Sequence, residues 1–187
     1  MKQKLTDKKL KDKRFRKTEK AIIEVFFSNK KVLSARVVVK RAKISRSTLY
    51  RHHESVYGIV PDYESYILEK YSKLMRILVR REKVRAKTLY YQMLVFILKN
   101  GDIFRMIIKR GNGQLLGRMV QRIKPKLTKL YRLPKNCEKI LAIYEKEIVG
   151  VLENWIRNDF EEDETMILSD IMYLTETMRA RLMPLVK

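Results

Sequence analysis

The stretch ISRSTLYRHHES, residues 44–55, gathers hydroxyl, guanidinium and imidazole side chains in a short space. His52, His53 and Glu54 suggest a metal or catalytic site. However, neighbouring residues of a helix point about 100° apart, whereas residues spaced i, i+3 or i+4 converge on one ligand. These are the only two histidines of the chain, so no second cluster is available to complete a metal site. We therefore expect no metal and no cofactor.

Other catalytic chemistry has little support in the sequence. There is no glycine-rich phosphate loop and no spacing typical of a Ser–His–Asp set, and Cys137 has no histidine near it in sequence. The adjacent Glu161 and Glu162 lie in a polar segment and are expected to be solvated. The sequence therefore predicts a protein that is not an enzyme.

Charge points instead to binding of a polyanion. The 187 residues carry 43 Lys and Arg against 21 Asp and Glu, a formal net charge of +22. Residues 1–57 hold 18 of these cations and only 5 acids, a net charge of +13. Nucleic acid is the first candidate partner and an anionic membrane surface the second.

The expected localisation is inferred from two kinds of segment that the sequence lacks. The N-terminus has no apolar segment typical of a signal peptide, and no apolar run is long enough to span a membrane. A single cysteine suits a reducing compartment. We expect a cytoplasmic protein with no membrane partner.

Three helices must position residues 44–55. A basic arm, residues 1–13, precedes an expected helix over 14–28, a short helix from Ser34 to Ala42 and another from Ser45 to His52. Ser34 and Ser45 are candidate N-caps. A small residue, Ala42, and apolar neighbours at a three- to four-residue turn are typical of a helix-turn-helix.

The rest of the chain predicts a helical body. Apolar periodicity predicts helices over 60–81, 88–99, 103–109, 114–123, 136–158 and 166–183. Pro125 and Pro134 are expected to bracket a loop-like segment. The fold class is therefore all-α, with a three-helix head over 14–60 and a body over 61–187.

The segment RFRKTEKAIIEVFFSNKKVLSARVVVKRAKISRSTLYRHHES, within residues 14–60, resembles the N-terminal DNA-binding domain of TetR-type transcriptional regulators. IVGVLENWI, residues 148–156, is similar to a Gly-then-Trp pattern in the penultimate helix of that family. The sequence differs from the family at Val39, Lys43, His53 and Val56, where Ala, Gly, Phe and Lys are usual. Because the turn of the family motif favours a left-handed residue, Lys43 there would cost about 1 kcal/mol.

The resemblance implies a homodimeric, ligand-responsive repressor that binds a palindromic operator in double-stranded DNA. An effector bound to the body would change the separation of the two heads, so that they no longer fit successive major grooves. We expect base contacts from Arg46, Ser47 and Thr48 and phosphate contacts from Tyr50, Arg51 and His52. The full set of expected DNA-binding residues is Ser34, Arg36, Ser45, Arg46, Ser47, Thr48, Tyr50, Arg51 and His52.

Two further sets of residues are expected in the body. An effector pocket is implied by the resemblance, and the candidates to line it are Tyr90, Met93, Phe96, Phe104, Met106 and Met119; a plain core is the alternative. Apolar stripes on the last two helices are expected to pair with a second copy in a four-helix interface. Those residues are Leu141, Ile148, Leu152, Trp155, Ile171, Leu174 and Met178.

Two alternative functions remain open at the level of sequence. The same fold could serve a co-regulator whose body binds a protein rather than a small molecule. A basic chain could also bind DNA through charge alone, without sequence preference, and such binding would collapse with salt.

Overall fold

The computed structural model describes residues 13–28, 33–80, 84–109, 114–134 and 136–182, and within these ranges every regular element is a helix. The expected all-α fold class is confirmed at this level. The basic arm, residues 1–13, lies outside the described residues except for Lys13, which begins the first helix. No described helix is both long enough and apolar enough to cross a lipid bilayer.

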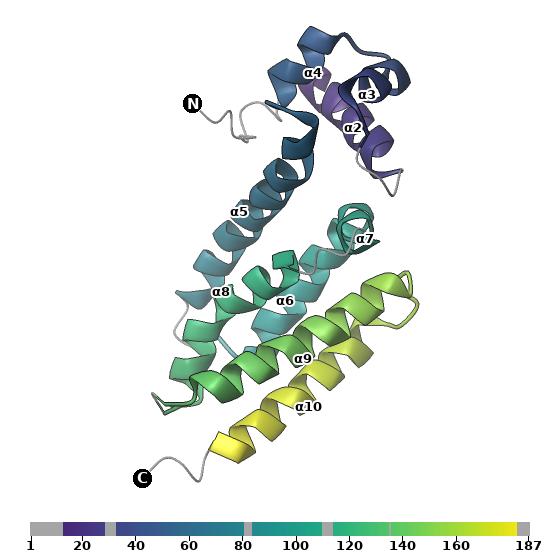
Figure 1. Ribbon diagram of the computed structural model, residues 1–187. Helices are drawn as coiled ribbons and strands as arrows, with labels where there is room; N and C mark the ends of the chain where they lie inside the picture. Colours follow the sequence, from purple (N-terminus) through teal and green to yellow (C-terminus); the bar gives the residue numbers. More distant parts are fainter. Residues whose placement is uncertain (1–12, 29–32, 81–83, 110–113, 135, 183–187) are drawn as a thin grey trace. The chain divides into compact units, whose positions relative to one another are not determined.

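The chain forms two compact units, and the division falls after Glu69, inside a helix. This differs from the expected boundary at residue 60. In the first unit the helices are α2 (Lys13–Phe27), α3 (Ala35–Ala42), α4 (Arg46–His52) and the short 3-10 helix η1 (Val56–Gly58), followed by the start of α5 (Ile59–Val79) (Figure 1). The second unit continues with α6 (Ala86–Lys99), α7 (Gly101–Lys109), α8 (Gln114–Leu130), α9 (Glu138–Arg157) and α10 (Glu164–Leu182).

Apolar residues at helical spacing hold the first unit together. Ile22 and Phe26 lie one turn apart on α2, and both are buried. Val38 of α3 and Leu49 of α4 are fully buried, and α3 packs against both α2 and α4. The two short helices therefore depend on this shared core, since isolated helices of 7 or 8 residues are not stable in water.

The turn between α3 and α4 contains a strained lysine. Lys43 has φ 54° and ψ 45°, which is the left-handed conformation that glycine adopts most easily. The N–H groups of Lys43 and Ile44 both donate to the carbonyl of Val39, the latter at 3.1 Å. These bonds end α3 in a Schellman-type turn in spite of the side chain at position 43.

The predicted end of the helix at residue 123 is wrong. α8 continues through Pro125 to Leu130, where the sequence suggested that the helix ends at residue 123. A proline inside a helix removes one hydrogen bond and costs about 3 kcal/mol. Ile123 and Leu127 are buried on the inner face of α8 while Pro125 is exposed, so apolar burial on either side offsets the lost bond.

In the second unit, α9 and α10 pack against each other, and α10 also packs against α6. The seven apolar residues that were expected to contact a second copy lie in this packing. Leu174 is half-buried, and the other six are buried: Leu141, Ile148, Leu152, Trp155, Ile171 and Met178. The stripe therefore packs within its own chain, which leaves the opposite faces of α9 and α10 for any partner.

Candidate nucleic-acid interface

Helix α4 begins with a well-formed N-cap. The Oγ of Ser45 accepts a hydrogen bond from the backbone N–H of Thr48 at 3.0 Å, and it also contacts the hydroxyl groups of Ser47 at 2.9 Å and Thr48 at 2.7 Å. This cap satisfies a donor that would otherwise be unpaired in the first turn. Ser34 also occupies an N-cap position, before α3, but contrary to expectation its side chain makes no capping hydrogen bond.

The outer face of α4 carries most of the side chains expected to contact DNA. Arg46, Ser47, Tyr50 and Arg51 are exposed, whereas Leu49 is fully buried. The guanidinium carbon of Arg46 lies 5.7 Å from the centroid of the Tyr50 ring, which is a cation–π arrangement. Arginine, hydroxyl and tyrosine groups thus share one accessible surface on a rigid helix.

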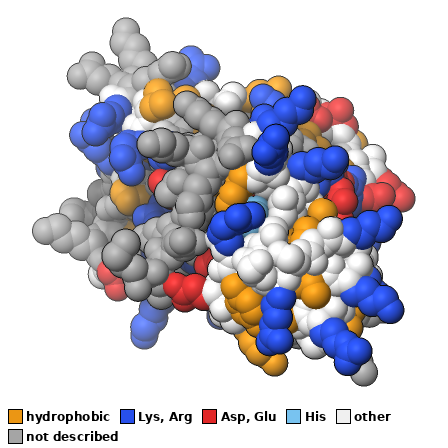
Figure 2. Space-filling view, turned by 90° about the horizontal axis from the view of Figure 1, so that it is seen from above, with side chains coloured by type: hydrophobic (Ala, Val, Ile, Leu, Met, Phe, Trp, Pro, Cys, Tyr) orange, Lys and Arg blue, Asp and Glu red, His pale blue; other side chains and the backbone are white. Residues whose placement is uncertain are grey.

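No acidic residue interrupts the sequence from Ala35 to His53. Its exposed cations are Arg36, Lys40, Arg41, Lys43, Arg46 and Arg51. In Figure 2, which views the molecule from above Figure 1, Lys and Arg side chains are spread over the visible face among a smaller number of Asp and Glu side chains. A surface of this kind attracts a phosphate backbone.

His52 does not fit its predicted role in phosphate contact. Its side chain is buried, with a relative exposure of 4%, and its ring stacks on Phe15 of α2 at a centroid distance of 3.9 Å. Its Nδ1 atom lies 2.6 Å from the Oε2 atom of Glu19. His52 therefore holds α4 against α2 and is not available to a partner on the surface.

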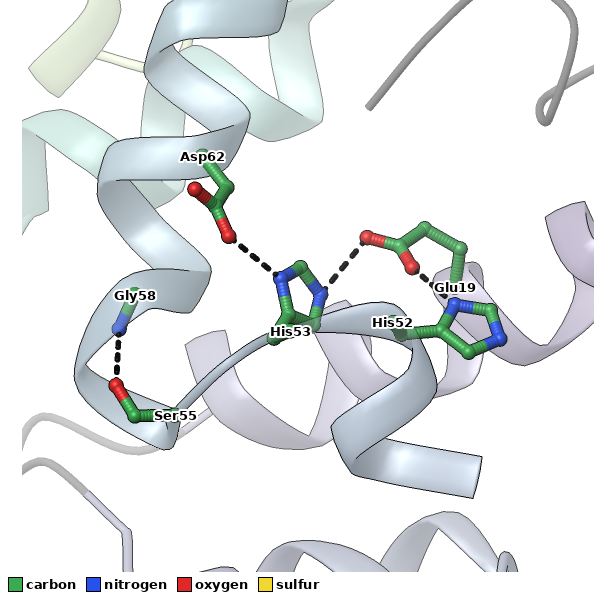
Figure 3. A network of polar contacts seen from close by, with 6 residues as sticks. All are labelled: Glu19, His52, His53, Ser55, Gly58 and Asp62. Carbon is green, nitrogen blue, oxygen red and sulfur yellow. Dashed lines mark hydrogen bonds and ion pairs between the residues drawn. The ribbon is translucent and has the colours of Figure 1, made fainter. Parts of the chain in front are cut away.

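Both histidines belong to a buried polar network that the sequence did not predict. Figure 3 shows the Glu19 carboxylate of α2 between the rings of His52 and His53, with Asp62 of α5 on the far side of His53. The Nε2 atom of His53 lies 3.0 Å from Oε1 of Glu19, and its Nδ1 atom lies 3.1 Å from Oδ2 of Asp62. The contact between Nε2 and Oε1 has the distance of an ion pair without the alignment of a hydrogen bond.

The pKa values of Glu19 and His53 are both shifted in the direction that favours the charged form of the side chain. Burial by itself would raise the pKa of Glu19, but the hydrogen bond with His52 and the nearby charges of His52 and His53 outweigh it and lower that pKa below its ordinary 4.5. Burial would lower the pKa of His53, but Glu19 and then Asp62 outweigh it and raise that pKa above its ordinary 6.5. Across the described ranges, no group of three or more His, Cys, Asp or Glu residues has the arrangement of a metal site.

The expected effector-pocket residues are packed as a core. Phe96 and Met106 are half-buried, and the other four are fully buried: Tyr90, Met93, Phe104 and Met119. The Tyr90 hydroxyl contacts the Tyr144 hydroxyl at 2.8 Å, so its polar end has a partner within the protein.

A groove of about 620 Å³ lies elsewhere in the second unit, between α6 and α10. Its walls include apolar, hydroxyl and cationic side chains. They are Arg85, Lys87, Thr88, Tyr91, Thr165, Leu168, Ser169 and Met172. The volume falls in the range of small-molecule sites, and both charged groups in the lining are positive.

Comparison with known proteins gives no match: no family model fits the sequence, and neither a curated protein nor a solved structure is significantly similar to it.

Proposed function

We propose that the chain is a DNA-binding transcriptional regulator of the TetR type, in which α3 and α4 form a helix-turn-helix and α4 is the recognition helix. The observation that carries the proposal is the outer face of α4, where Arg46, Ser47, Tyr50 and Arg51 are exposed and the helix itself carries no acidic residue. Arginine and hydroxyl groups on a helix can read base edges in a major groove.

The turn and the cap support this proposal. A recognition helix must present its N-terminal residues in one orientation, because side chains there reach the bases. The left-handed Lys43 fixes the end of α3, and the Ser45 cap fixes the start of α4. Thr48 is half-buried with its hydroxyl bonded to Ser45, so we assign it mainly to the cap rather than to base contact.

The proposal is tested by selecting duplexes from genomic DNA with the full chain and measuring affinity for them against random competitor. Arg46→Ala and Tyr50→Ala should each lower affinity for the selected duplex by about tenfold or more, since one good base or phosphate contact contributes about 1–3 kcal/mol. Lys129→Ala, which removes an exposed cation from α8, is the matched control and should leave affinity within about twofold. Equal effects of all three variants would refute the placement of the interface on α4.

The same measurement distinguishes a sequence-specific regulator from a protein that binds DNA through charge alone. A chain that binds through charge alone shows no preference for the selected duplex over random DNA, and its affinity falls steeply with salt. A sequence-specific regulator keeps a ratio of affinities between the two duplexes as salt rises.

We further propose that the regulator acts as a homodimer through the outer faces of α9 and α10. Ile143, Met166 and Tyr173 are large apolar or aromatic side chains with exposures of 55%, 60% and 73%. Gly150 lies on the same outer side of α9, and a Cβ atom added to it would meet no other atom within 4 Å, so a partner helix could pack closely there. Ile143→Asp and Tyr173→Asp should both yield monomers in analytical ultracentrifugation, whereas Lys129→Asp, an exposed position on α8, should remain dimeric.

The effector in this proposal is a small molecule with an anionic group, bound in the groove between α6 and α10. Arg85 and Lys87 lie at the start of α6, where the helix dipole also favours an anion. If the groove binds no ligand and a protein is recovered on the exposed face of α9 and α10 instead, the co-regulator alternative is favoured.

A further inference from the structure

The position of His53 requires both of its ring nitrogens to face carboxylates. Nε2 lies 3.0 Å from Glu19 and Nδ1 lies 3.1 Å from Asp62, and the His53 side chain is fully buried. A neutral imidazole carries one N–H and one lone pair, whereas the protonated ring carries an N–H on both nitrogens. A neutral His53 would therefore direct a lone pair at one of the two carboxylates, of which Glu19 is buried and Asp62 is 36% exposed.

The three partners come from three different helices. Glu19 belongs to α2, Asp62 to α5, and His53 is the residue directly after α4. His52, the last residue of α4, shares the Glu19 carboxylate with His53 at 2.6 Å. The end of α4 is thus connected to both of the helices that flank it in the first unit.

We propose that His53 is a buried imidazolium that bridges Glu19 and Asp62, and that this bridge positions α4 for DNA binding. The second clause rests on the proposed function; the first does not. His53, Glu19 and Asp62 are positioning residues here, since none of them lies on the outer face of α4.

The charge balance around the bridge supports a cation at its centre. The ionisable groups that face it are Glu19 from α2, His52 from α4, and Asp62 and Tyr63 from α5. Burial, followed by the negative charge of Glu19, raises the pKa of Tyr63 to about 12, so Tyr63 stays neutral. Two carboxylates therefore flank the His53 ring, and Glu19 is shared with His52. Removing one partner of a buried ion pair is strongly destabilising because it leaves an uncompensated charge.

The bridge predicts that DNA binding depends on pH in one direction. The bridge is complete while His53 is protonated, and it is lost as pH rises through the raised pKa of His53. Lysine and arginine contacts with phosphate do not titrate until far higher pH. Affinity should therefore fall as pH rises through the raised pKa of His53.

The protonation state can be read directly, because the chain contains only two histidines. Untagged full-length protein with ¹⁵N-labelled imidazoles is titrated from pH 5 to pH 9 by NMR, and His52→Gln assigns the two rings. We expect His53 to keep both ring protons above pH 6.5. Glu19→Gln should lower its titration point, since the amide keeps the shape of the side chain and removes the charge.

DNA affinity is measured on the same samples with a matched control. Glu24→Gln makes the same chemical change on the exposed side of α2, where Glu24 pairs with Lys20 at 3.5 Å. Both variants add one net positive charge, which by itself favours DNA binding. Glu19→Gln should nevertheless weaken binding to the selected duplex by about tenfold relative to Glu24→Gln, and Asp62→Asn should act in the same direction as Glu19→Gln.

The possible results of these experiments test the bridge, its positioning role and the proposed function one by one. His53 titrating at or below pH 6.5 in the parent protein would refute the bridge. A protonated His53 together with equal affinities of Glu19→Gln and Glu24→Gln would refute its positioning role. A chain that binds no duplex at any pH would refute the proposed function, and the imidazole titration would still decide whether the bridge exists.

Discussion

Lys43→Gly should stabilise the first unit, although glycine usually destabilises a protein. Lys43 is exposed and has φ 54°, so the substitution removes no packing and relieves a left-handed conformation. A residue with a Cβ atom pays about 1–2 kcal/mol in that conformation. Glycine gains about 0.4–1 kcal/mol of conformational entropy in the unfolded chain, which offsets part of the relief. The expected net stabilisation is about 0.5–1 kcal/mol.

Hydrogen exchange at the Ile44 amide measures this effect locally. That N–H donates to the Val39 carbonyl at 3.1 Å and is released when the turn opens. A gain of 0.5–1 kcal/mol corresponds to exchange that is roughly two- to fivefold slower. The local measurement matters because the chain has two compact units, whose unfolding could occur separately.

Lys40→Gly is the matched control for this prediction. It removes the same side chain from an exposed position inside α3, three residues earlier, where the backbone is helical. Glycine there should destabilise the helix by about 1 kcal/mol, so the two substitutions should have opposite signs. If Lys43→Gly destabilises the turn as Lys40→Gly does, position 43 does not adopt the left-handed conformation.

Three further predictions concern stability. Pro125→Ala should stabilise the second unit by about 1–2 kcal/mol in urea unfolding followed by Trp155 fluorescence, because alanine restores a helix hydrogen bond; a loss would show that α8 does not continue through residue 125. Tyr144→Phe should cost about 1–3 kcal/mol in the same assay, because it removes the hydroxyl that contacts the buried hydroxyls of Tyr90 and Thr175, whereas the exposed Tyr173→Phe should be neutral. The melting temperature of the first unit should be highest between the lowered pKa of Glu19 and the raised pKa of His53: stability is lost as pH falls through the former and as pH rises through the latter. A flat profile across both limits would contradict the network.

The helices of the first unit could be predicted from local sequence signals. Apolar residues one turn apart predicted α2, and small polar residues before apolar ones predicted the starts of α3 and α4. The family resemblance has glycine at the turn where this chain has Lys43, and φ 54° shows that Lys43 adopts the left-handed conformation in spite of its side chain. These signals are local, because capping, turn conformation and periodicity depend on residues only a few positions apart.

Local signals misled the prediction at Pro125 and in the last two helices. A proline usually ends a helix, but the decision depends on how much apolar surface the continued helix buries, and Ile123 and Leu127 supply that burial. Periodicity identified the apolar stripe of α9 correctly. It could not show whether that stripe meets another helix of the same chain or a second copy.

The sequence by itself determined an all-helical, strongly basic chain with a short cationic helix capped by Ser45. Only the tertiary structure decided the role of the two histidines, which the sequence offered either as surface groups or as an incomplete metal site. Their carboxylate partner, Glu19, is 33 residues from His52 along the chain, and its charge is buried. A pairing of that kind depends on how α2 packs against α4, and no spacing within one helix encodes it.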